Sequence, residues 1–372
     1  MKITLERSAL LKSLNHVQSV VERRNTIPIL SNVLLDATKG KLSLTATDLD
    51  IEIVETLDAD VARPGATTAS AHMLYDIVRK LPDGAQVQIE LQGDSGRIVL
   101  SAGRSRFQLG ALPREDFPAM TAGNLPHAFA MPASDLKRLI DKTRFAISNE
   151  ETRYYLNGIY LHAAKTKDQT VLRAVATDGH RLARFELPVP AGAEGIPGVI
   201  VPRKTVLEVV KLLDGADGDT EVALSSSKIR FTAGELVLTS KLIDGTFPDY
   251  ERVIPRHNEK TLEIDTRSFA AAVDRVSTIS MEKGRAVKLH VSAGKLVLSV
   301  NNPDSGSAEE ELACSYDADP IDIGFNSRYL MDVAGQIRSD AVVFSLADAG
   351  SPTIVRDPGD EQALYVLMPM RV

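Results

Sequence analysis

The amino-acid sequence predicts an α+β fold of three repeated domains, each with two helices packed on antiparallel sheets. The first indication is internal repetition. Thr47-Asp48, Thr177-Asp178 and Asn301-Asn302 follow one another at intervals of 130 and 124 residues, close to one third of the 372-residue chain. An interval of this length is the size of a domain and not of a solenoid repeat. The second indication is that helical and strand patterns alternate within each repeat, with runs of adjacent strands that favour antiparallel pairing.

Six segments have the apolar spacing of an amphipathic helix, as residues 74–81 illustrate. The predicted helices cover residues 6–24, 70–80, 133–144, 202–213, 266–279 and 326–338. Ser8 is the expected start of the first helix, and Pro82 and Gly215 follow the ends of the second and fourth.

Leucines alternate with other residues around Leu42, Leu238 and Leu298, as expected for strands with one buried face. Tight turns are predicted at Lys39-Gly40, Ala233-Gly234 and Ala293-Gly294. Pro, Gly and polar residues collect near 120–130 and 254–262, which are the expected linkers. The predicted domains are therefore residues 1–125, 126–256 and 257–372.

The composition is that of a globular protein, with 44% hydrophobic and 25% charged residues. The single cysteine, Cys314, excludes a disulfide within the chain and fits a reducing cytoplasm. The first residues lack the apolar core of a secretory signal, and no apolar run approaches the roughly 18 residues of a membrane span. We therefore expect a cytoplasmic protein with no membrane partner.

The charges are unevenly distributed between the predicted helices and the rest of the chain. The six helical segments hold 17 Lys and Arg against 8 Asp and Glu, whereas the remaining residues hold 26 and 42. Since one face of each helix is apolar, the basic residues must lie on the opposite faces. Helices that share one side of the molecule would give that side a positive surface, as expected for a protein that attracts a phosphate backbone.

The sequence has no phosphate-binding loop and no zinc-ligand spacing, so we expect no metal, no cofactor and no catalytic residue. Asp178 and His180 could suggest an acid–base pair. We favour a structural turn at Asp178-Gly179, because the first repeat has Thr-Asp at the same place without a histidine.

Two further features indicate contacts with other molecules. The chain ends in an apolar, methionine-rich segment in which Pro369 would interrupt a central strand, so we expect the last residues to lie at the surface. Arg104 and Arg106 lie in the first repeat, and a run of opposite charge, Glu309 to Glu311, lies in the corresponding late strand of the third. Opposite charges at the two ends of a repeat array favour head-to-tail association, which closes a ring when the rotation allows.

Several blocks of the sequence resemble the bacterial DNA polymerase III β subunit, the sliding clamp family. They are RYYLNG (153–158), ATDGHRLA (176–183), VPRK (201–204), LIDGTFPDY (242–250), GFNSRYL (324–330) and YVLMPMR (365–371). SLTATDLD (43–50) and SAGRSRF (101–107) extend the resemblance into the first third, so that it covers essentially the whole chain in order. Gly350, Pro352 and the final Val372 depart from the family's pattern.

The resemblance implies a non-catalytic DNA sliding clamp, a processivity factor of which one chain forms half of a closed ring. Such a head-to-tail homodimer encircles duplex DNA without reading its sequence. It tethers the replicative polymerase, the clamp loader, repair and translesion polymerases, mismatch-repair proteins and an initiation regulator. A hydrophobic pocket receives short peptides from these partners.

The resemblance also implies site residues. The partner-peptide residues are Arg153, Leu156, Thr177, Gly179, His180, Arg181, Leu182, Pro248, Arg252, Val253, Asn326, Tyr329, Val366, Leu367, Met368, Pro369, Met370 and Arg371. The DNA-contacting residues are Arg24, Tyr154, Tyr155, Arg203 and Lys204, to which the charge pattern of the helices adds Lys12, Lys137 and Arg138. The dimer-interface residues are Phe107, Leu109 and Ile279, with Arg104 and Arg106 opposite Glu309, Glu310 and Glu311.

Two alternatives remain at this point. One is a ring or scaffold for proteins only, in which the helical charge is incidental. The other is a hydrolase that uses Asp178 and His180. The first predicts no retention on circular DNA, and the second predicts that His180→Ala abolishes a turnover.

Overall fold

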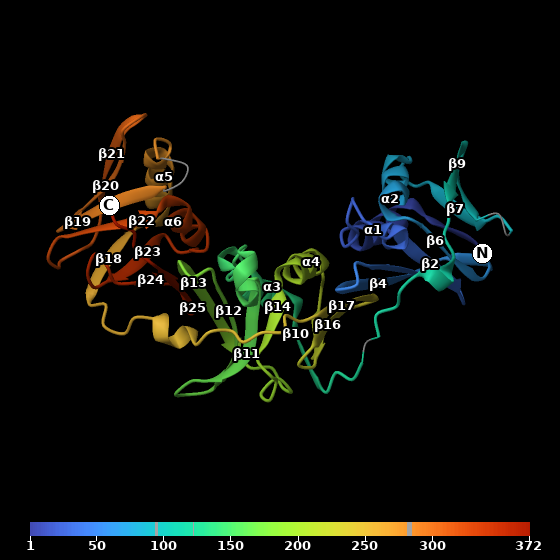
Figure 1. Ribbon diagram of the computed structural model, residues 1–372, viewed down its shortest axis with the longest axis horizontal. Coiled ribbons are helices and arrows are strands. Elements are labelled where there is room, and N and C mark those ends of the chain that lie inside the picture. Colours follow the sequence, from blue (N-terminus) through green and yellow to red (C-terminus); the bar gives the residue numbers. More distant parts are fainter. Residues whose placement is uncertain (94–95, 122, 281–284) are drawn as a thin grey trace. The chain divides into compact units, whose positions relative to one another are not determined.

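The computed structural model describes residues 1–93, 96–121, 123–280 and 285–372 (Figure 1). These residues gather into two compact units. Unit 1 contains Met1–Lys137, Pro190–Pro197 and Lys204–Leu242, and unit 2 contains Arg138–Val189, Gly198–Arg203 and Ile243–Val372. Residue 122, within the predicted linker at 120–130, lies outside the described residues.

Unit 1 is built on two antiparallel sheets. Their strands are β1 (Lys2–Glu6), β2 (Asn32–Thr38), β3 (Lys41–Thr47), β4 (Ile51–Asp58), β5 (Asp60–Arg63), β6 (Gly65–Ser70), β7 (Gln86–Leu91), β8 (Arg97–Ala102), β9 (Ser105–Gly110), β10 (His127–Pro132), β15 (Asp219–Leu224), β16 (Lys228–Ala233) and β17 (Leu236–Lys241). The five-stranded sheet has the order β5-β1-β7-β8-β9, and the eight-stranded sheet has the order β10-β15-β16-β17-β4-β3-β2-β6.

Unit 2 also contains two antiparallel sheets. Their strands are β11 (Gly158–Lys165), β12 (Thr170–Thr177), β13 (Arg181–Pro188), β14 (Val199–Pro202), β18 (Lys260–Asp265), β19 (Ala286–Ser292), β20 (Lys295–Asn302), β21 (Gly306–Ala313), β22 (Ile321–Asn326), β23 (Ala341–Leu346), β24 (Thr353–Asp357) and β25 (Asp360–Leu367). The eight-stranded sheet has the order β14-β11-β12-β13-β25-β24-β23-β18, and the four-stranded sheet has the order β21-β20-β19-β22.

Each eight-stranded sheet joins strands of two neighbouring repeats. In unit 1, four strands of the central repeat (β10, β15, β16 and β17) continue into four strands of the first, through the pairing of β17 with β4. In unit 2, the other four strands of the central repeat continue into the third, through the pairing of β13 with β25. Each compact unit therefore contains one complete eight-stranded sheet, and the central repeat is divided between the two units. Joining sheets in this way covers strand edges that would otherwise be exposed.

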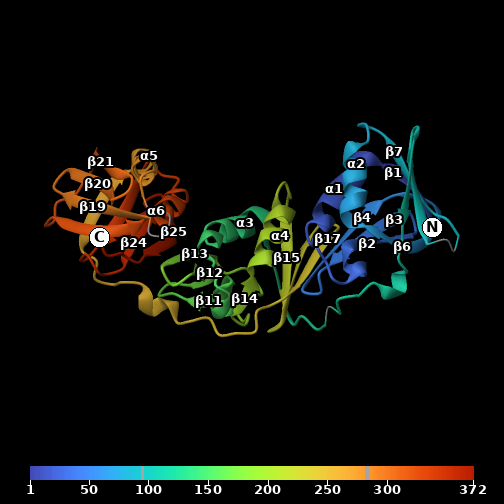
Figure 2. The ribbon, with the colours of Figure 1, turned by 45° about the horizontal axis from the view of Figure 1, so that its top comes forward.

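All six predicted helices are confirmed. They are α1 (Arg7–Gln18), α2 (Ala71–Lys80), α3 (Ala133–Asp141), α4 (Arg203–Leu213), α5 (Thr266–Ser277) and α6 (Ser327–Ala334). In unit 1, α1 packs on α2 and on β3 and β4, as Figure 2 shows. In unit 2, α5 packs on α6, β20 and β21. The predicted α+β arrangement of helices on antiparallel sheets is therefore confirmed.

The predicted start of the first helix at Ser8 is wrong. The Glu6 carboxylate caps α1, because it accepts hydrogen bonds from the amides of Ser8 at 2.8 Å and Ala9 at 3.1 Å. The predicted helix also extended six residues too far, since α1 ends at Gln18. Val21 is buried without being helical, which explains why it fits the apolar stripe.

The repeated Thr-Asp pairs form the same turn in two repeats. The hydroxyl of Thr47 accepts from the Leu49 amide, and the hydroxyl of Thr177 accepts from the Gly179 amide. The Asp48 and Asp178 carboxylates each accept from the amides two and three residues further on. These are Asx turns between adjacent antiparallel strands, and they confirm the structural interpretation of Asp178-Gly179.

The chain ends as the proline predicts. The central strand β25 stops at Leu367, two residues before Pro369, and Met368 is 37% exposed. Among the described residues, no helix combines the length and the apolar character that crossing a membrane requires.

Candidate functional site

The C-terminal segment is fixed to the turn between β12 and β13. Leu182 pairs with Val366 in the adjacent strands β13 and β25. Beyond the strand, the Met368 amide donates to the His180 carbonyl at 2.9 Å. The predicted peptide-binding residues at 177–182 and 366–371 are therefore neighbours in space, although almost 190 residues separate them in the chain.

The third repeat supplies the next wall of this surface. The Met370 amide donates to the carbonyl of Gly324, within β22, at 2.8 Å. Tyr329, in the helix that follows, lies with its ring 6.4 Å from the ring of His180. A Cβ atom on Gly324 would collide with Val372, so glycine permits the close approach of the last residues. We call the exposed or partly exposed residues of this region the tail patch: Gly179, His180, Pro248, Val253, Tyr329, Met368, Pro369, Met370 and Arg371.

The buried guanidinium of Arg181 links the residues that support the tail patch. It donates to Asp178 at 3.1 Å, to Asp332 at 2.5 Å and to the carbonyl of Phe145 at 2.6 Å. It also lies over the ring of Tyr329, 4.4 Å from its centroid. With 7% of its side chain exposed, Arg181 supports the patch and presents little of itself to a partner.

Replacement of Arg181 by alanine is expected to lower the free energy of unfolding by about 3 kcal/mol, because two carboxylates and a carbonyl lose their donor in a low-dielectric site. Urea denaturation followed by circular dichroism measures the change. Arg252→Ala is the control, since the Arg252–Asp249 pair is exposed and contributes at most about 1 kcal/mol. Equal stability of the two variants would contradict the supporting role.

The segment that carries Pro248 and Val253 is anchored by Tyr250, His162 and Arg173, none of which is among the predicted site residues. The hydroxyl of Tyr250 contacts His162 Nε2 at 2.9 Å and accepts from Arg173 at 3.1 Å. Burial raises the pKa of the Tyr250 hydroxyl, and the nearby Arg173 opposes this effect. The only sequence signal for this anchor was the position of Tyr250 at the end of the resemblance block 242–250.

Phe247 and Tyr250 connect this anchor to the tail patch. They belong to a buried cluster that also contains Leu156, Leu182 and Val366. These last three residues, together with Thr177, Arg181 and Leu367, are the predicted peptide-binding residues that the structure buries. Their side chains shape the patch, and the exposed residues provide its surface.

Two polar residues of the predicted site have defined local partners. Arg153 forms a bidentate contact with Glu150 and lies so close to Gly179 that a Cβ there would be 2.5 Å from its Nη1. Asn326 caps α6 by accepting from the Arg328 amide at 2.9 Å. Glycine at position 179 thus provides both the positive φ of 87° and the space that Arg153 occupies.

Some of the predicted DNA-contacting residues are exposed, and others form ion pairs within the chain. Arg24 is exposed, and the structure gives it no ion pair with any described residue. Lys12 and Arg203 are also exposed, and Tyr154 is 54% exposed, whereas Tyr155 and Lys137 are partly buried. Arg138 instead pairs with Asp360 at 2.8 Å and lies over the Phe185 ring.

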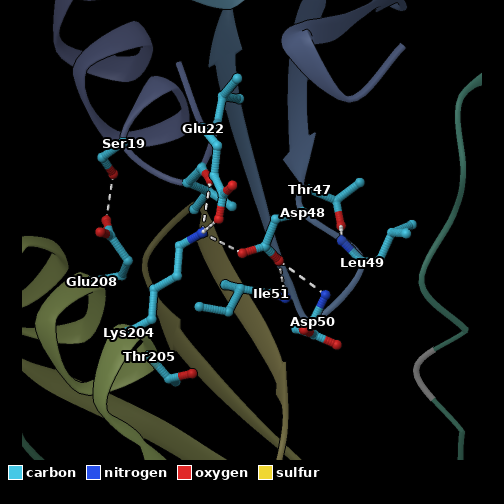
Figure 3. A network of polar contacts seen from close by, with 12 residues as sticks. Ser19, Glu22, Thr47, Asp48, Leu49, Asp50, Ile51, Lys204, Thr205 and Glu208 are labelled. Carbon is cyan, nitrogen blue, oxygen red and sulfur yellow. Dashed lines mark hydrogen bonds and ion pairs between the residues drawn. The ribbon is translucent and has the colours of Figure 1, made fainter. Parts of the chain in front are cut away.

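Lys204 also forms ion pairs, with two acidic residues of unit 1 (Figure 3). Its ammonium pairs with Asp48 and with Glu22 at 3.4 Å. Burial alone would lower the pKa of Lys204, but the hydrogen bond and charge of Asp48 raise it above its usual value. Lys204 is therefore charged at neutral pH and already has an acidic partner.

The predicted dimer-interface strands lie at the edges of their sheets. Arg106, Phe107 and Leu109 belong to β9, the last strand of the five-stranded sheet. Glu309 to Glu311 belong to β21, the last strand of the four-stranded sheet. Within the chain, Glu310 pairs with Arg275 at 2.5 Å and Glu311 with Lys295 at 2.7 Å. Ile279, after α5, is half-buried, and its carbonyl accepts from Asn302.

Phe107 lines a cavity of about 540 Å³ beside α2. The other lining residues include Met73, Ile77 and Leu81, which are apolar, and Met73 is 52% exposed. An exposed methionine beside a half-buried phenylalanine is the kind of surface that favours contact with another protein.

Three repeated domains of helices on joined antiparallel sheets define the DNA clamp fold. Solved sliding clamps share this fold over the whole chain. The clamp of Bartonella birtlesii bound to griselimycin has a TM-score of 0.98 at 54% identity, with complete coverage of both chains. The beta sliding clamp of Caulobacter crescentus, with PEG bound to its putative beta-motif tethering region, has a TM-score of 0.98 at 57% identity and covers 100% of this chain and 99% of that one.

Sequence comparison gives the particular family. Residues 1–121, 130–249 and 251–371 match the N-terminal, central and C-terminal domains of the DNA polymerase III beta subunit. The chain is 58% identical to the beta sliding clamp of Caulobacter vibrioides and 41% identical to that of Escherichia coli, in both cases over the full length of both chains. The chain belongs to the DNA polymerase III beta subunit family, the bacterial beta sliding clamps.

Proposed function

We propose that this chain forms a closed homodimeric ring around duplex DNA and tethers the replicative polymerase to it. The observation that carries the proposal is the full-length similarity to beta sliding clamps. The three predicted domains, residues 1–125, 126–256 and 257–372, would each supply one third of a half-ring. Enclosure then retains the protein on DNA, so that the phosphate contacts can be weak and the ring can slide.

Edge strands β9 and β21 support head-to-tail closure. Among the strands that the structure describes, each has a partner on one side only, and an edge strand can extend its sheet with a strand from another chain. The exposed residues Arg104 and Arg106 lie next to and within β9, and the exposed Glu309 lies within β21. Opposite charges suit pairing of β9 in one copy with β21 in the other, and Phe107 would close the apolar centre of that contact.

The proposed mechanism needs no catalytic residue. The Asp178 carboxylate accepts hydrogen bonds from the amides of His180 and Arg181 and from the Arg181 guanidinium. The His180 ring stacks with Tyr329. Because the imidazole of His180 makes its described contact with Tyr329, the pair is better explained as part of a binding surface than as an acid–base couple. This argues against the hydrolase alternative.

The tail patch is the proposed docking site for partner peptides. Its methionines can adapt to different apolar side chains, and His180, Tyr329 and Arg371 can bond polar groups of a short peptide. Through this site the chain would bind the replicative polymerase, the clamp loader, repair and translesion polymerases, mismatch-repair proteins and an initiation regulator. The griselimycin complex of the Bartonella birtlesii clamp supports ligand binding by a closely similar protein.

The test of enclosure uses circular DNA. Protein loaded onto a nicked circle by its clamp loader is expected to co-elute with the DNA in gel filtration, and to be lost after a restriction enzyme linearises the circle. The control is a linear DNA with both ends blocked by bound protein, which should retain it. Stable retention on linear DNA with free ends would contradict topological linkage and favour ordinary binding.

A further inference from the structure

The ammonium group of Lys204 has three hydrogen-bond acceptors within the protein. It donates to a carboxylate oxygen of Asp48, to the main-chain carbonyl of Val20 at 3.2 Å and to Glu22 at 3.4 Å (Figure 3). An ammonium has three N–H donors, and these three acceptors account for them. A phosphate that approached Lys204 would have to compete with these acceptors for its N–H groups.

The same contacts hold the segment that follows α1. The Ser19 hydroxyl donates to Glu208 of α4, and His72 of α2 contacts the carbonyl of Val21 at 2.9 Å. With Lys204 on Val20 and Glu22, side chains of two helices therefore hold the four residues from Ser19 to Glu22. The next two residues are Arg23 and Arg24, both exposed and without an ion pair to any residue that the structure describes.

We propose that Lys204 is a positioning residue, which holds the Arg23-Arg24 segment ready for DNA and does not itself contact a phosphate. This inference deepens the proposed function and rests on it. Because the segment is fixed before DNA arrives, Arg23 and Arg24 lose less conformational freedom when they bind. A direct role for Lys204 would carry a cost, because it would leave Asp48, whose side chain is 11% exposed, without its partner.

Asp48→Asn separates the two roles. Asparagine keeps the oxygen that accepts from the Asp50 and Ile51 amides at 2.9 and 2.7 Å, so the turn is preserved. The variant nevertheless loses the charge that holds Lys204. If Lys204 contacts phosphate directly, its release and the loss of a negative charge strengthen DNA binding. If Lys204 positions the segment, binding weakens although the protein has become more positive.

The assay is fluorescence anisotropy of a short labelled duplex titrated with the full chain at low salt. We expect Asp48→Asn to bind roughly threefold or more weakly, comparable to the loss of one phosphate contact. Asp50→Asn is the matched control, because it also removes one negative charge, only two residues from Asp48. The Asp50 carboxylate is 73% exposed and pairs with Lys241, not with Lys204. We expect it to bind as tightly as the wild type or slightly more tightly.

Limited proteolysis tests the positioning without DNA. Trypsin cleaves after arginine, and under native conditions cleavage reports how often a segment opens. We expect Lys204→Met and Asp48→Asn to be cut after Arg23 or Arg24 several times faster than the wild type and Asp50→Asn, with fragments identified by mass spectrometry.

Either of two results would overturn the inference: unchanged cleavage in both network variants, or tighter DNA binding by Asp48→Asn. Failure of the loaded wild-type protein to be retained on the nicked circle would instead refute the proposed function. The rate of cleavage then decides by itself whether Lys204 holds the segment.

Discussion

Deletion of Met368–Val372 is expected to abolish stimulation of the polymerase while the fold remains intact. The deletion removes the methionines of the tail patch, whose loss should weaken peptide binding by roughly 30- to 100-fold. The regular structure ends at Leu367, and the deleted segment contributes two main-chain hydrogen bonds, from Met368 to His180 and from Met370 to Gly324. Their loss should cost about 1–3 kcal/mol of stability.

Two measurements check this expectation. Primer extension on a primed circle reports polymerase stimulation, and circular dichroism reports the fold. The double substitution Met368→Ala with Met370→Ala keeps the chain length, and so avoids placing a new terminal carboxylate beside the buried Leu367. Leu207→Ala, at an exposed position on α4, is the control. Global unfolding of the truncated chain, or full stimulation by the double variant, would contradict the role of the tail patch.

Phe107→Ala is expected to have the second large effect, on ring closure. A buried aromatic residue at the centre of an interface typically contributes about 2–4 kcal/mol, which corresponds to a dissociation constant roughly 30- to 1,000-fold higher. The chain itself should remain folded, because Phe107 is only half-buried and lines a cavity on the surface of unit 1.

Light scattering across a dilution series measures this change. The wild type should show twice the 40.3 kDa mass of one chain, and the variant should shift towards a single mass at the same concentrations. Gln108→Ala is the matched control, since Gln108 is the exposed neighbour of Phe107 on β9. A variant that stays dimeric on dilution would place the interface elsewhere.

Local chemistry explains why so much of the fold could be predicted. The helices and strands follow from apolar spacing, and the Lys39-Gly40, Ala233-Gly234 and Ala293-Gly294 turns do connect adjacent strands. The Thr-Asp turns could be predicted because side chain and amide are two or three residues apart. The start of α1 was missed, because a glutamate cap is a weaker sequence signal than the serine two residues later.

The candidate sites were less predictable, because their key contacts join distant parts of the chain. Lys204 and Asp48 are 156 residues apart, and Arg138 and Asp360 are 222 apart. The helical pattern predicts both Lys204 and Arg138 as exposed charges on the polar faces of their helices. Similarly, nothing in the spacing of Arg173 and Tyr250 indicated that they meet beneath the segment that carries Val253.

The threefold repeat, the α+β class, the strand turns and the surface position of the chain's last residues can therefore be derived from the amino-acid sequence, since each depends on neighbouring residues. The division of the central repeat between two joined sheets, by contrast, follows from the three-dimensional packing. The same packing leaves some basic residues exposed, such as Arg24, and pairs others with carboxylates, such as Lys204 and Arg138. Charge pairing and burial depend on distances in space, and long-range packing sets these distances.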